Sequence, residues 1–398
     1  MIDTQPDIVP TPEPAVRPPR TVHRWWAVPA AAVGVLTLVG LLALSVLPAT
    51  LWARTSKGED AQFAQVPSDA QPVADRLSFD AVDRYRAEGD ILFVTIRDPE
   101  ISVLDWLVSR GLGEVSLLSY TDRFGEQTPD QQRRFSFEMM RSAKQTAEYV
   151  ALAHLGYPAE LIPGDVIIAD MVCLEANEAG DRCVRFAPSD ALLDPGDTLL
   201  AVDGVTLENI DDLTKVLADH EPGDVVTVEY DRPDVGKGSG DVELIASNDG
   251  TDRAIIGFQP FDTDSAKLPF EVDIDTQDIG GPSAGLAFTL TLIDELTPGE
   301  LTGGHQVAVT GTIETDGSVG AIGGLVSKTS AVRQLGAELF IVPSAQGEAD
   351  IAAARAVAGD DLRIVAVDDL DQALQVLAEL GGNGLQLGAP GADYQPPA

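Results

Sequence analysis

The chain has 398 residues and a net charge of −38, because 64 Asp and Glu residues outnumber 26 Lys and Arg residues. This acidity excludes nucleic-acid binding through the phosphate backbone and argues against a face that holds lipid headgroups with basic residues. With two cysteines and four scattered histidines, the sequence disfavours a disulfide scaffold, a cysteine-rich zinc site and an H-E-x-x-H zinc hydrolase. At 44% hydrophobic residues it is long enough for two or three domains with buried cores.

An uncharged apolar run, 25–53, lies between Arg24 and Arg54 near the N-terminus. It is long enough to cross a bilayer as a helix, and tryptophans lie at both of its ends, where interfacial rings are favourable. An uncleaved transmembrane helix is favoured over a cleaved signal peptide, whose apolar region is shorter, and over a buried helix of a soluble domain. The basic residues slightly favour a cytoplasmic tail at 1–24, which would place the rest of the chain outside the cytoplasm.

The segment after this run is polar, and we predict that 54–85 is a linker. The apolar stretch 91–96 (ILFVTI) is then typical of a buried strand, and 99–113 contains a short helix ended by glycine. In 131–156, apolar residues recur at helical spacing, which predicts a long amphipathic helix. Together these elements make up region 86–158.

The two cysteines flank a short turn-rich stretch. Cys173 and Cys183 enclose LEANEAGDR, which lies between two apolar runs. A disulfide across a hairpin suits this spacing and is chemically allowed outside the cytoplasm. Two unpaired thiols are the alternative.

Region 159–263 has the pattern of a small, mainly β module. It contains Ala187-Pro188-Ser189, the turn Asp194–Asp197, the strand TLLAVDG, a helix around 209–219 and the run PGDVVTVEY. In this order these features resemble a PDZ domain of the bacterial protease type. Such domains bind extended peptides by adding a strand to an exposed sheet edge. The resemblance implies that 165–171 is that edge strand, and a merely structural insertion is the alternative.

Region 264–381 alternates strands and helices, which is typical of an α/β fold. We expect strands at 270–274, 306–313, 339–343 and 363–367, and helices beginning near Pro282 and Val326 and covering 347–357 and 370–379. The tail 382–398 is rich in Gly and Pro and is expected to be disordered.

Two residues of this region form a candidate nucleophile and base. Ser283 lies in GGPSAG just before an apolar helix, where backbone N–H groups and the helix dipole favour a developing oxyanion. A plain helix cap is the alternative. Lys328 follows a Gly-Gly pair in the first turn of another helix, where burial and the dipole lower the pKa of a lysine toward that of a general base. A solvated surface lysine is the alternative there.

The order GPSAG, VTGTI, GxIGGLxxK and GAxxFIVP resembles the proteolytic domain of Lon-type serine peptidases. The resemblance implies a Ser283–Lys328 catalytic dyad, with Thr310 orienting the lysine amine and backbone amides around Gly281–Ala284 stabilising the oxyanion. It extends to the helix in 86–158, so the PDZ module is inserted in a split Lon-type domain. Gly280 and Thr312 depart from the family, which usually carries Asp and Glu there.

The whole plan is similar to membrane-anchored PDZ/Lon-type peptidases of Gram-positive bacteria. The expected fold is therefore α+β to α/β, a Lon-type domain with an inserted PDZ domain and one N-terminal transmembrane helix. The implied activity is an ATP-independent serine endopeptidase that cleaves unfolded or PDZ-delivered proteins outside the cytoplasm. No Walker A loop occurs in the sequence.

We expect protein or peptide substrates, a lipid bilayer around the single helix, no metal, no cofactor and no nucleic acid. The resemblance also implies an assembly of several copies, since Lon-type domains form rings. A non-catalytic PDZ scaffold and a membrane-linked chaperone or adaptor are the alternative functions.

Overall fold

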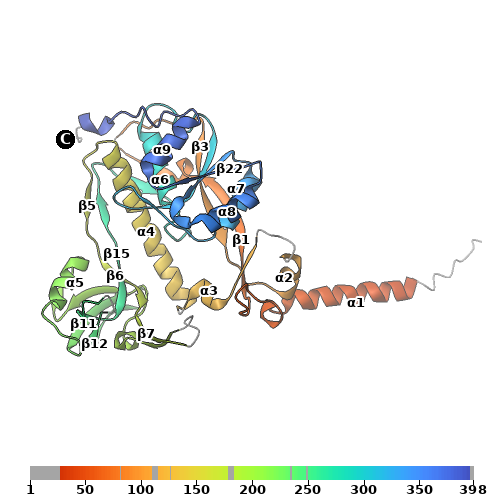
Figure 1. The fold of residues 1–398 in the computed structure, drawn as a ribbon, viewed down its shortest axis with the longest axis horizontal. Helices are drawn as coiled ribbons and strands as arrows, with labels where there is room; N and C mark the ends of the chain where they lie inside the picture. The colour runs from red at the N-terminus through yellow and green to blue at the C-terminus, as the bar shows by residue number, and fades with distance from the viewer. Residues whose placement is uncertain are drawn as a thin grey trace, which may run out of the picture.

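The computed structural model describes residues 27–80, 82–109, 115–125, 127–177, 183–233, 235–247 and 250–394. Two lobes lie on either side of the long helix α4 (Pro129–His154), with a further helix extending away from them (Figure 1). We call 166–262 the smaller lobe; the larger lobe is built from the chain on both sides of it. The chain enters the smaller lobe through β5 (Glu160–Ile162) and leaves it through β16 (Ser265–Lys267), and these two strands pair antiparallel.

The larger lobe contains a six-stranded sheet with the order β22-β21-β18-β3-β1-β4. Its strands are β1 (Phe63–Pro72), β3 (Asp90–Arg97), β4 (Ser116–Leu118), β18 (Gln306–Val309), β21 (Leu339–Pro343) and β22 (Arg363–Val367). The strands from β22 to β3 are parallel to their neighbours, whereas β1 runs antiparallel to β3 and to β4. Parallel neighbours need crossover connections, and helices supply most of them here.

Helices cover both faces of this sheet. They are α4, α6 (Gly285–Leu296) and α9 (Leu370–Glu379) on one face, and α7 (Leu325–Leu335) and α8 (Glu348–Ala358) on the other. Successive residues of β3 alternate between the two cores, because strand side chains point to opposite faces in turn. Phe93 packs with α4 and α6, and Leu92 packs with α7 and α8. The helices predicted after residue 264 are present. Of the predicted strands, 306–313 is divided into β18 and a two-residue strand at Thr312–Ile313, and 270–274 is shortened to Val272–Ile274.

The helix predicted at 131–156 begins two residues earlier in the structure. Thr128 caps α4 by accepting a hydrogen bond from the Gln131 N–H, and the Gln131 side chain accepts one from the Thr128 N–H. Pro129 occupies the first turn, where its missing N–H costs nothing. The helix predicted within 99–113 is α2 (Val103–Ser109), and α3 (Tyr120–Phe124) follows it. Residues 110–114 lie outside the described part.

The smaller lobe is an antiparallel sheet with the order β12-β11-β9-β6-β15, and β10 pairs with β9. Its strands are β6 (Val166–Met171), β9 (Thr198–Val202), β10 (Val205–Thr206), β11 (Val225–Arg232), β12 (Gly236–Glu243) and β15 (Phe258–Asp262). Helix α5 (Ile210–Leu217) covers it, burying Leu213 and Leu217. The helix predicted around 209–219 is therefore present.

The expectation that 165–171 forms an exposed edge strand is wrong. Strand β6 lies between β9 and β15, and β15 pairs along it from Phe258 to Asp262. Strand β15 was not predicted because it contains Pro260, which has no backbone N–H to donate to a β-ladder. The proline is tolerated here because β15 is itself an edge strand with a register shift at Gln259 and Pro260.

Four further strand pairs are short. They are β2 (Leu77–Phe79) with β17 (Val272–Ile274), β7 (Cys173–Ala176) with β8 (Cys183–Phe186), β13 (Ile245–Ala246) with β14 (Ala254–Ile255), and β19 (Thr312–Ile313) with β20 (Val319–Gly320). A disulfide joins Cys173 and Cys183 across the β7–β8 pair.

The predicted linker at 54–85 is instead part of the larger lobe. Strand β1 pairs with β3 and β4, β2 pairs with β17, and Ala64 and Val73 are buried. The sequence of β1 contains polar residues and two prolines, which is typical of a linker. These residues fit a strand because most of its side chains are only partly buried. Pro67 borders a register shift in the β1–β3 ladder, where a missing N–H is tolerated.

The predicted disorder of 382–398 is wrong for residues 382–394. The Tyr394 ring packs edge-on against Tyr157 and Phe270, and its hydroxyl donates to the Pro269 carbonyl over 3.1 Å. The Gly391 N–H donates to the Leu155 carbonyl over 3.1 Å. The aromatic ring holds a segment whose composition alone resembles a flexible tail. Residues 395–398 lie outside the described part.

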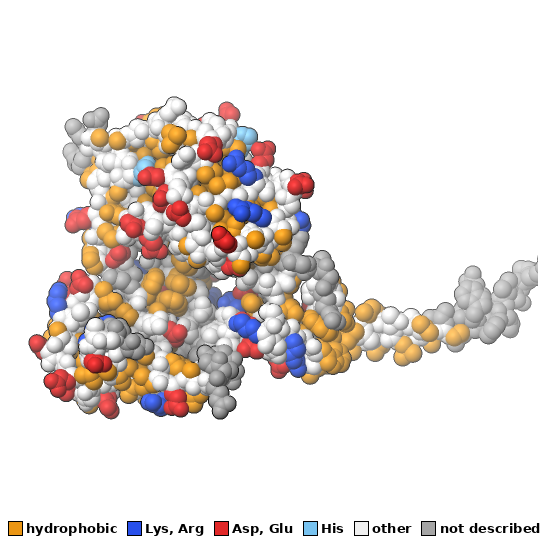
Figure 2. All heavy atoms as spheres, in the orientation of Figure 1, with side chains coloured by type: hydrophobic (Ala, Val, Ile, Leu, Met, Phe, Trp, Pro, Cys, Tyr) orange, Lys and Arg blue, Asp and Glu red, His pale blue; other side chains and the backbone are white. Residues whose placement is uncertain are grey.

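The apolar run at 25–53 is divided in the structure. Helix α1 (Ala27–Val46) extends away from both lobes, with mostly hydrophobic side chains on its surface (Figures 1 and 2). It ends at Val46, close to Pro48, which we expect from the sequence to mark its limit, and Ala49 and Ala53 are buried in the larger lobe. Within the described ranges, no helix combines the length and the apolarity that a membrane crossing requires. The predicted tail at 1–24 lies outside these ranges.

Candidate active site

Ser283 lies in a tight turn directly before α6, in which Ala284 is the N-cap residue. Gly285 begins the helix, and a Cβ there would lie within 3.0 Å of the Ile313 backbone nitrogen. Only glycine therefore lets the start of α6 approach β19 this closely. The predicted position of Ser283 at a helix N-terminus is present in the structure.

Lys328 lies in the first turn of α7, and its N–H donates to the carbonyl of the N-cap residue, Gly324. Gly324 has a φ of 70°, a left-handed conformation that glycine adopts without strain. The Lys328 side chain is 2% exposed, so it is not a solvated surface lysine. Its Nζ donates to the Ser283 Oγ over 2.7 Å and to the Thr310 Oγ1 over 3.0 Å.

Thr310 and Gly311 hold the backbone of the serine. They separate β18 from β19, where a single strand was predicted over 306–313. The Thr310 hydroxyl donates to the Ser283 carbonyl over 3.1 Å, and the Gly311 N–H donates to the same oxygen over 2.9 Å. The three side chains therefore form one network, in which Thr310 contacts both Ser283 and Lys328.

Burial changes the protonation of the lysine. Removal of the Lys328 ammonium from water lowers its pKa from 10.5 to about 7. A large fraction of the amine is then neutral near pH 7 and can accept the Ser283 hydroxyl proton. His305 takes no part, because it precedes β18, about 16 Å along the strand from Thr310, and contacts Glu338.

The backbone N–H groups of this turn are not equivalent. The Gly281 N–H donates to the Ser136 carbonyl of α4 over 2.8 Å, so the expectation that it stabilises an oxyanion is wrong. Gly281 has a φ of 89°, and its contribution is to shape the turn. The N–H groups of Ser283 and Ala284 donate to no residue in the described ranges, and they are the groups that remain for an oxyanion.

The roles of three further residues of the site were not predicted from the sequence. Gly311 and Gly324 have positive φ angles, and glycine next to a candidate catalytic residue is the signal that could have suggested them. Ser136 contributes a backbone carbonyl from the middle of a helix, and nothing in a sequence marks such a contact.

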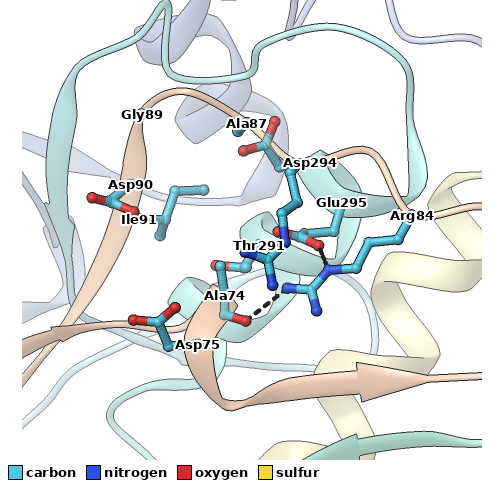
Figure 3. Close-up of a pocket in the computed structure, with 11 residues that line it drawn as sticks. Ala74, Asp75, Arg84, Ala87, Gly89, Asp90, Ile91, Thr291, Asp294 and Glu295 are labelled. Atoms are coloured by element: carbon cyan, nitrogen blue, oxygen red, sulfur yellow. Dashed lines mark hydrogen bonds and ion pairs between the residues drawn. The ribbon is translucent and has the colours of Figure 1, made fainter.

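A separate pocket of about 80 Å³ lies at the other end of α6, about 18 Å from Ser283 along the helix axis. Arg84 pairs with the Glu295 carboxylate there and donates to the Ala74 carbonyl (Figure 3). Burial raises the pKa of the nearby Asp294 to about 7. The guanidinium is fully engaged, and we interpret this cluster as a structural connection between the 74–84 segment and α6.

In the described ranges, no group of three or more His, Cys, Asp or Glu residues could hold a metal.

Residues 275–379 match the family model of the Lon protease (S16) C-terminal proteolytic domain. Curated relatives over this part include the Lon proteases of Campylobacter concisus, 33% identical over 95 residues, and Xanthomonas oryzae pv. oryzae, 36% identical over 99 residues. These matches cover 24% and 25% of this chain and 12% and 11% of the relatives. The chain thus contains a Lon-type proteolytic domain, of a serine peptidase family, and spans about an eighth of the length of these relatives.

Among solved structures, the PDZ domain of the SdrC-like protein from Listeria monocytogenes is 20% identical. The match covers 24% of this chain and 85% of that chain, with a TM-score of 0.20. The corresponding domain from Listeria innocua is 19% identical, over 23% of this chain and 92% of that chain, with a TM-score of 0.18. Matches at this level do not establish what the smaller lobe binds.

Proposed function

We propose that this protein is a serine endopeptidase in which Ser283 is the nucleophile and Lys328 is the general base. The observation that carries this proposal is the 2.7 Å contact between the Lys328 Nζ and the Ser283 Oγ, made by a buried lysine. Burial supplies a neutral amine near pH 7, and the position before α6 supplies two backbone donors. A structural lysine would instead be expected to pair with a carboxylate.

The reaction follows from these contacts. The Lys328 amine takes the Ser283 hydroxyl proton as the Oγ forms a bond to the peptide carbonyl carbon. The Ser283 and Ala284 N–H groups stabilise the resulting oxyanion. The peptide C–N bond then breaks, and the lysine ammonium gives its proton to the leaving amine. Lys328 next takes a proton from water as the water oxygen attacks the ester carbon. The ester C–O bond then breaks, which releases the acid, and the lysine ammonium returns its proton to the Ser283 Oγ.

We further propose that cleavage needs no ATP, since the sequence contains no Walker A loop. Cleavage without ATP supplies no energy for unfolding, so we propose that the substrates are unfolded proteins or extended segments held by the smaller lobe. The exposed sheet edges of that lobe are β15 and β12, and an added strand would pair there. An assembly of several copies stays a prediction, which the mass of the purified protein in solution tests.

We propose a location outside the cytoplasm, with α1 and its flanking residues as a membrane anchor. The exposed apolar side chains of α1 support this proposal, as does the Cys173–Cys183 disulfide, which suits an oxidising compartment. Protease added to intact expressing cells should remove the lobes, and alkaline carbonate should leave the chain in the membrane fraction. Release by carbonate, or full protection of the lobes, contradicts this location.

The activity is tested with the purified full-length chain in detergent and an unstructured casein, without ATP. The wild type should release fragments, whereas Ser283→Ala and Lys328→Ala should release none while keeping the wild-type melting temperature. Addition of ATP and Mg²⁺ should not change the rate. Equal cleavage by wild type and Ser283→Ala would show that the nucleophile is wrong, and strong stimulation by ATP would contradict ATP independence.

A further inference from the structure

One face of the chain leading into and along α4 docks on the smaller lobe. The Gln127 side chain donates to the Ala169 carbonyl over 3.0 Å, and the Gln131 side chain donates to Asp194 over 3.0 Å. One turn further, the Phe135 ring packs edge-on against Phe261 of β15, with the ring centroids 5.4 Å apart. Gln131 and Phe135 are four positions apart on α4, so their side chains lie on the same face of the helix, whereas Gln127 precedes the helix.

The next residue along this helix contacts the turn that carries the serine. The Ser136 carbonyl accepts the Gly281 N–H over 2.8 Å, and Gly281 is two residues from Ser283. A Cβ added to Gly280 would lie 2.9 Å from the Ser136 Cβ, so this turn and α4 are in close contact. Adjacent residues of α4 therefore contact the smaller lobe and the Ser283 turn.

We propose that the smaller lobe positions the Ser283 turn, through the contact of Phe261 with Phe135 and of Ser136 with Gly281. This inference rests on the proposed peptidase function. Phe261 and Phe135 are positioning residues, because neither has a described contact with Ser283 or Lys328. The smaller lobe then has a role in the chemical step itself, in addition to any capture of substrate.

A coupling between the smaller lobe and the Ser283 turn should change the reaction rate without changing its pH dependence. Lys328 lies on α7, and its Nζ contacts the Thr310 Oγ1 as well as the Ser283 Oγ. Neither α7 nor Thr310 belongs to α4. Loss of the Phe261 contact should therefore displace the backbone donors at Ser283 and Ala284 while leaving the lysine in its buried position. A displacement of 1 Å at a reacting group can lower a rate by about 100-fold. We expect a slower reaction with an unchanged pH midpoint.

The test measures how fast a fluorophosphonate probe labels Ser283 in the full-length chain, because this small probe needs no capture by the smaller lobe. Phe261→Ala should lower the labelling rate about tenfold, with the melting temperature and the pH midpoint unchanged. Phe261→Tyr, which keeps the ring, should restore the rate. Phe186→Ala is the matched control, since Phe186 packs on the core of the same lobe, and it should label at the wild-type rate.

Two results would overturn the proposal. One is labelling of Phe261→Ala within twofold of the wild type, and the other is equal slowing by Phe186→Ala. If Phe261→Ala does not fold, Gln131→Glu decides the question, because it removes the amide N–H donated to Asp194 and keeps an oxygen for the Thr128 N–H that caps α4. That variant should label several-fold more slowly, and a wild-type rate would overturn the proposal. If the wild type is labelled no faster than Ser283→Ala, the proposed peptidase function itself has failed.

Discussion

The Lys328 Nζ lies 2.7 Å from the Ser283 Oγ, although the two residues are 45 positions apart and lie near the N-termini of different helices. The packing that brings them together also removes the lysine from water. Position and protonation are therefore set by the same packing, because a lysine exposed to solvent would keep its proton at neutral pH.

This relationship predicts the pH dependence of the reaction. The pKa of Lys328 is lowered to about 7, so the reactive neutral amine increases as the pH rises through that value. The kcat/KM for peptide cleavage should rise about tenfold per pH unit below pH 7 and level off above it. Rates measured from pH 5 to 9 test this.

Lys267→Ala is the control for this profile, since Lys267 is exposed and pairs with Glu160 across the β5–β16 strand pair. It should keep the wild-type profile. A midpoint above about pH 9 would contradict the assignment, because it would indicate a lysine with an ordinary solvated environment.

Thr310→Val should lower activity through both of its contacts. The hydroxyl accepts from the Lys328 Nζ and donates to the Ser283 carbonyl, and valine has the same shape without either bond. We expect kcat to fall about 10- to 100-fold, and the free energy of unfolding to fall by about 1–2 kcal/mol, because buried polar groups lose their partner. Thr310→Ser keeps the hydroxyl and should retain most of the activity. Similar kcat values for Thr310→Val and the wild type would show that the hydroxyl does not orient the amine.

The pair Gly323 and Gly324 offers a comparison between neighbouring positions. A Cβ on Gly324 would lie 2.5 Å from the Ile96 Cδ1 and 2.8 Å from the Gln65 Oε1, at a φ of 70°. A Cβ on Gly323 meets no described atom within 4 Å. Gly324→Ala should therefore destabilise the protein by about 1–3 kcal/mol and displace Lys328, whereas Gly323→Ala should be nearly neutral.

The measurements for this pair are chemical unfolding and the labelling rate of Ser283. Gly324→Ala should label at least tenfold more slowly than Gly323→Ala. Equal rates and equal unfolding free energies for the two variants would show that the left-handed start of α7 is not needed to place the lysine.

The α/β pattern after residue 264 was predictable because its elements bury continuous apolar faces. Ser283 and Lys328 were each predictable as candidates because small residues and helix starts surround them, and the resemblance to Lon-type peptidases implied their pairing. Strands β1 and β15 were missed because each contains proline and takes its place through pairing with distant strands. The order of residues along a chain does not show which edge a proline-containing strand will cover.

The contact between Ser136 and Gly281 could not be predicted for a related reason. It joins the middle of a regular helix to a turn 145 residues later through backbone atoms alone. The fixed position of Tyr394 has a similar origin, since its ring is held by Tyr157 and Phe270, which are distant in sequence. Such contacts depend on the assembled fold and leave no local pattern.

The last prediction concerns Glu148, a carboxyl buried in α4 at 3% exposure. Desolvation raises its pKa to about 8, with Asp273 adding to the rise and Lys144 opposing it. Between the ordinary value of 4.5 and about 8, the folded protein holds a proton that the unfolded chain has lost. The free energy of unfolding therefore decreases as the pH rises through this window, by up to about 1.4 kcal/mol per unit.

Glu148→Gln imitates the protonated acid and removes the pH-dependent loss of stability that ionisation of Glu148 causes. It should match the wild type near pH 4.5 and be more stable at pH 8, by on the order of 2–4 kcal/mol. Urea unfolding at the two pH values measures the difference, and Glu138→Gln, on a more exposed side of the same helix beside Arg141, is the control. An equal stability difference at both pH values would contradict a buried proton on Glu148, because a change in packing alone does not depend on pH.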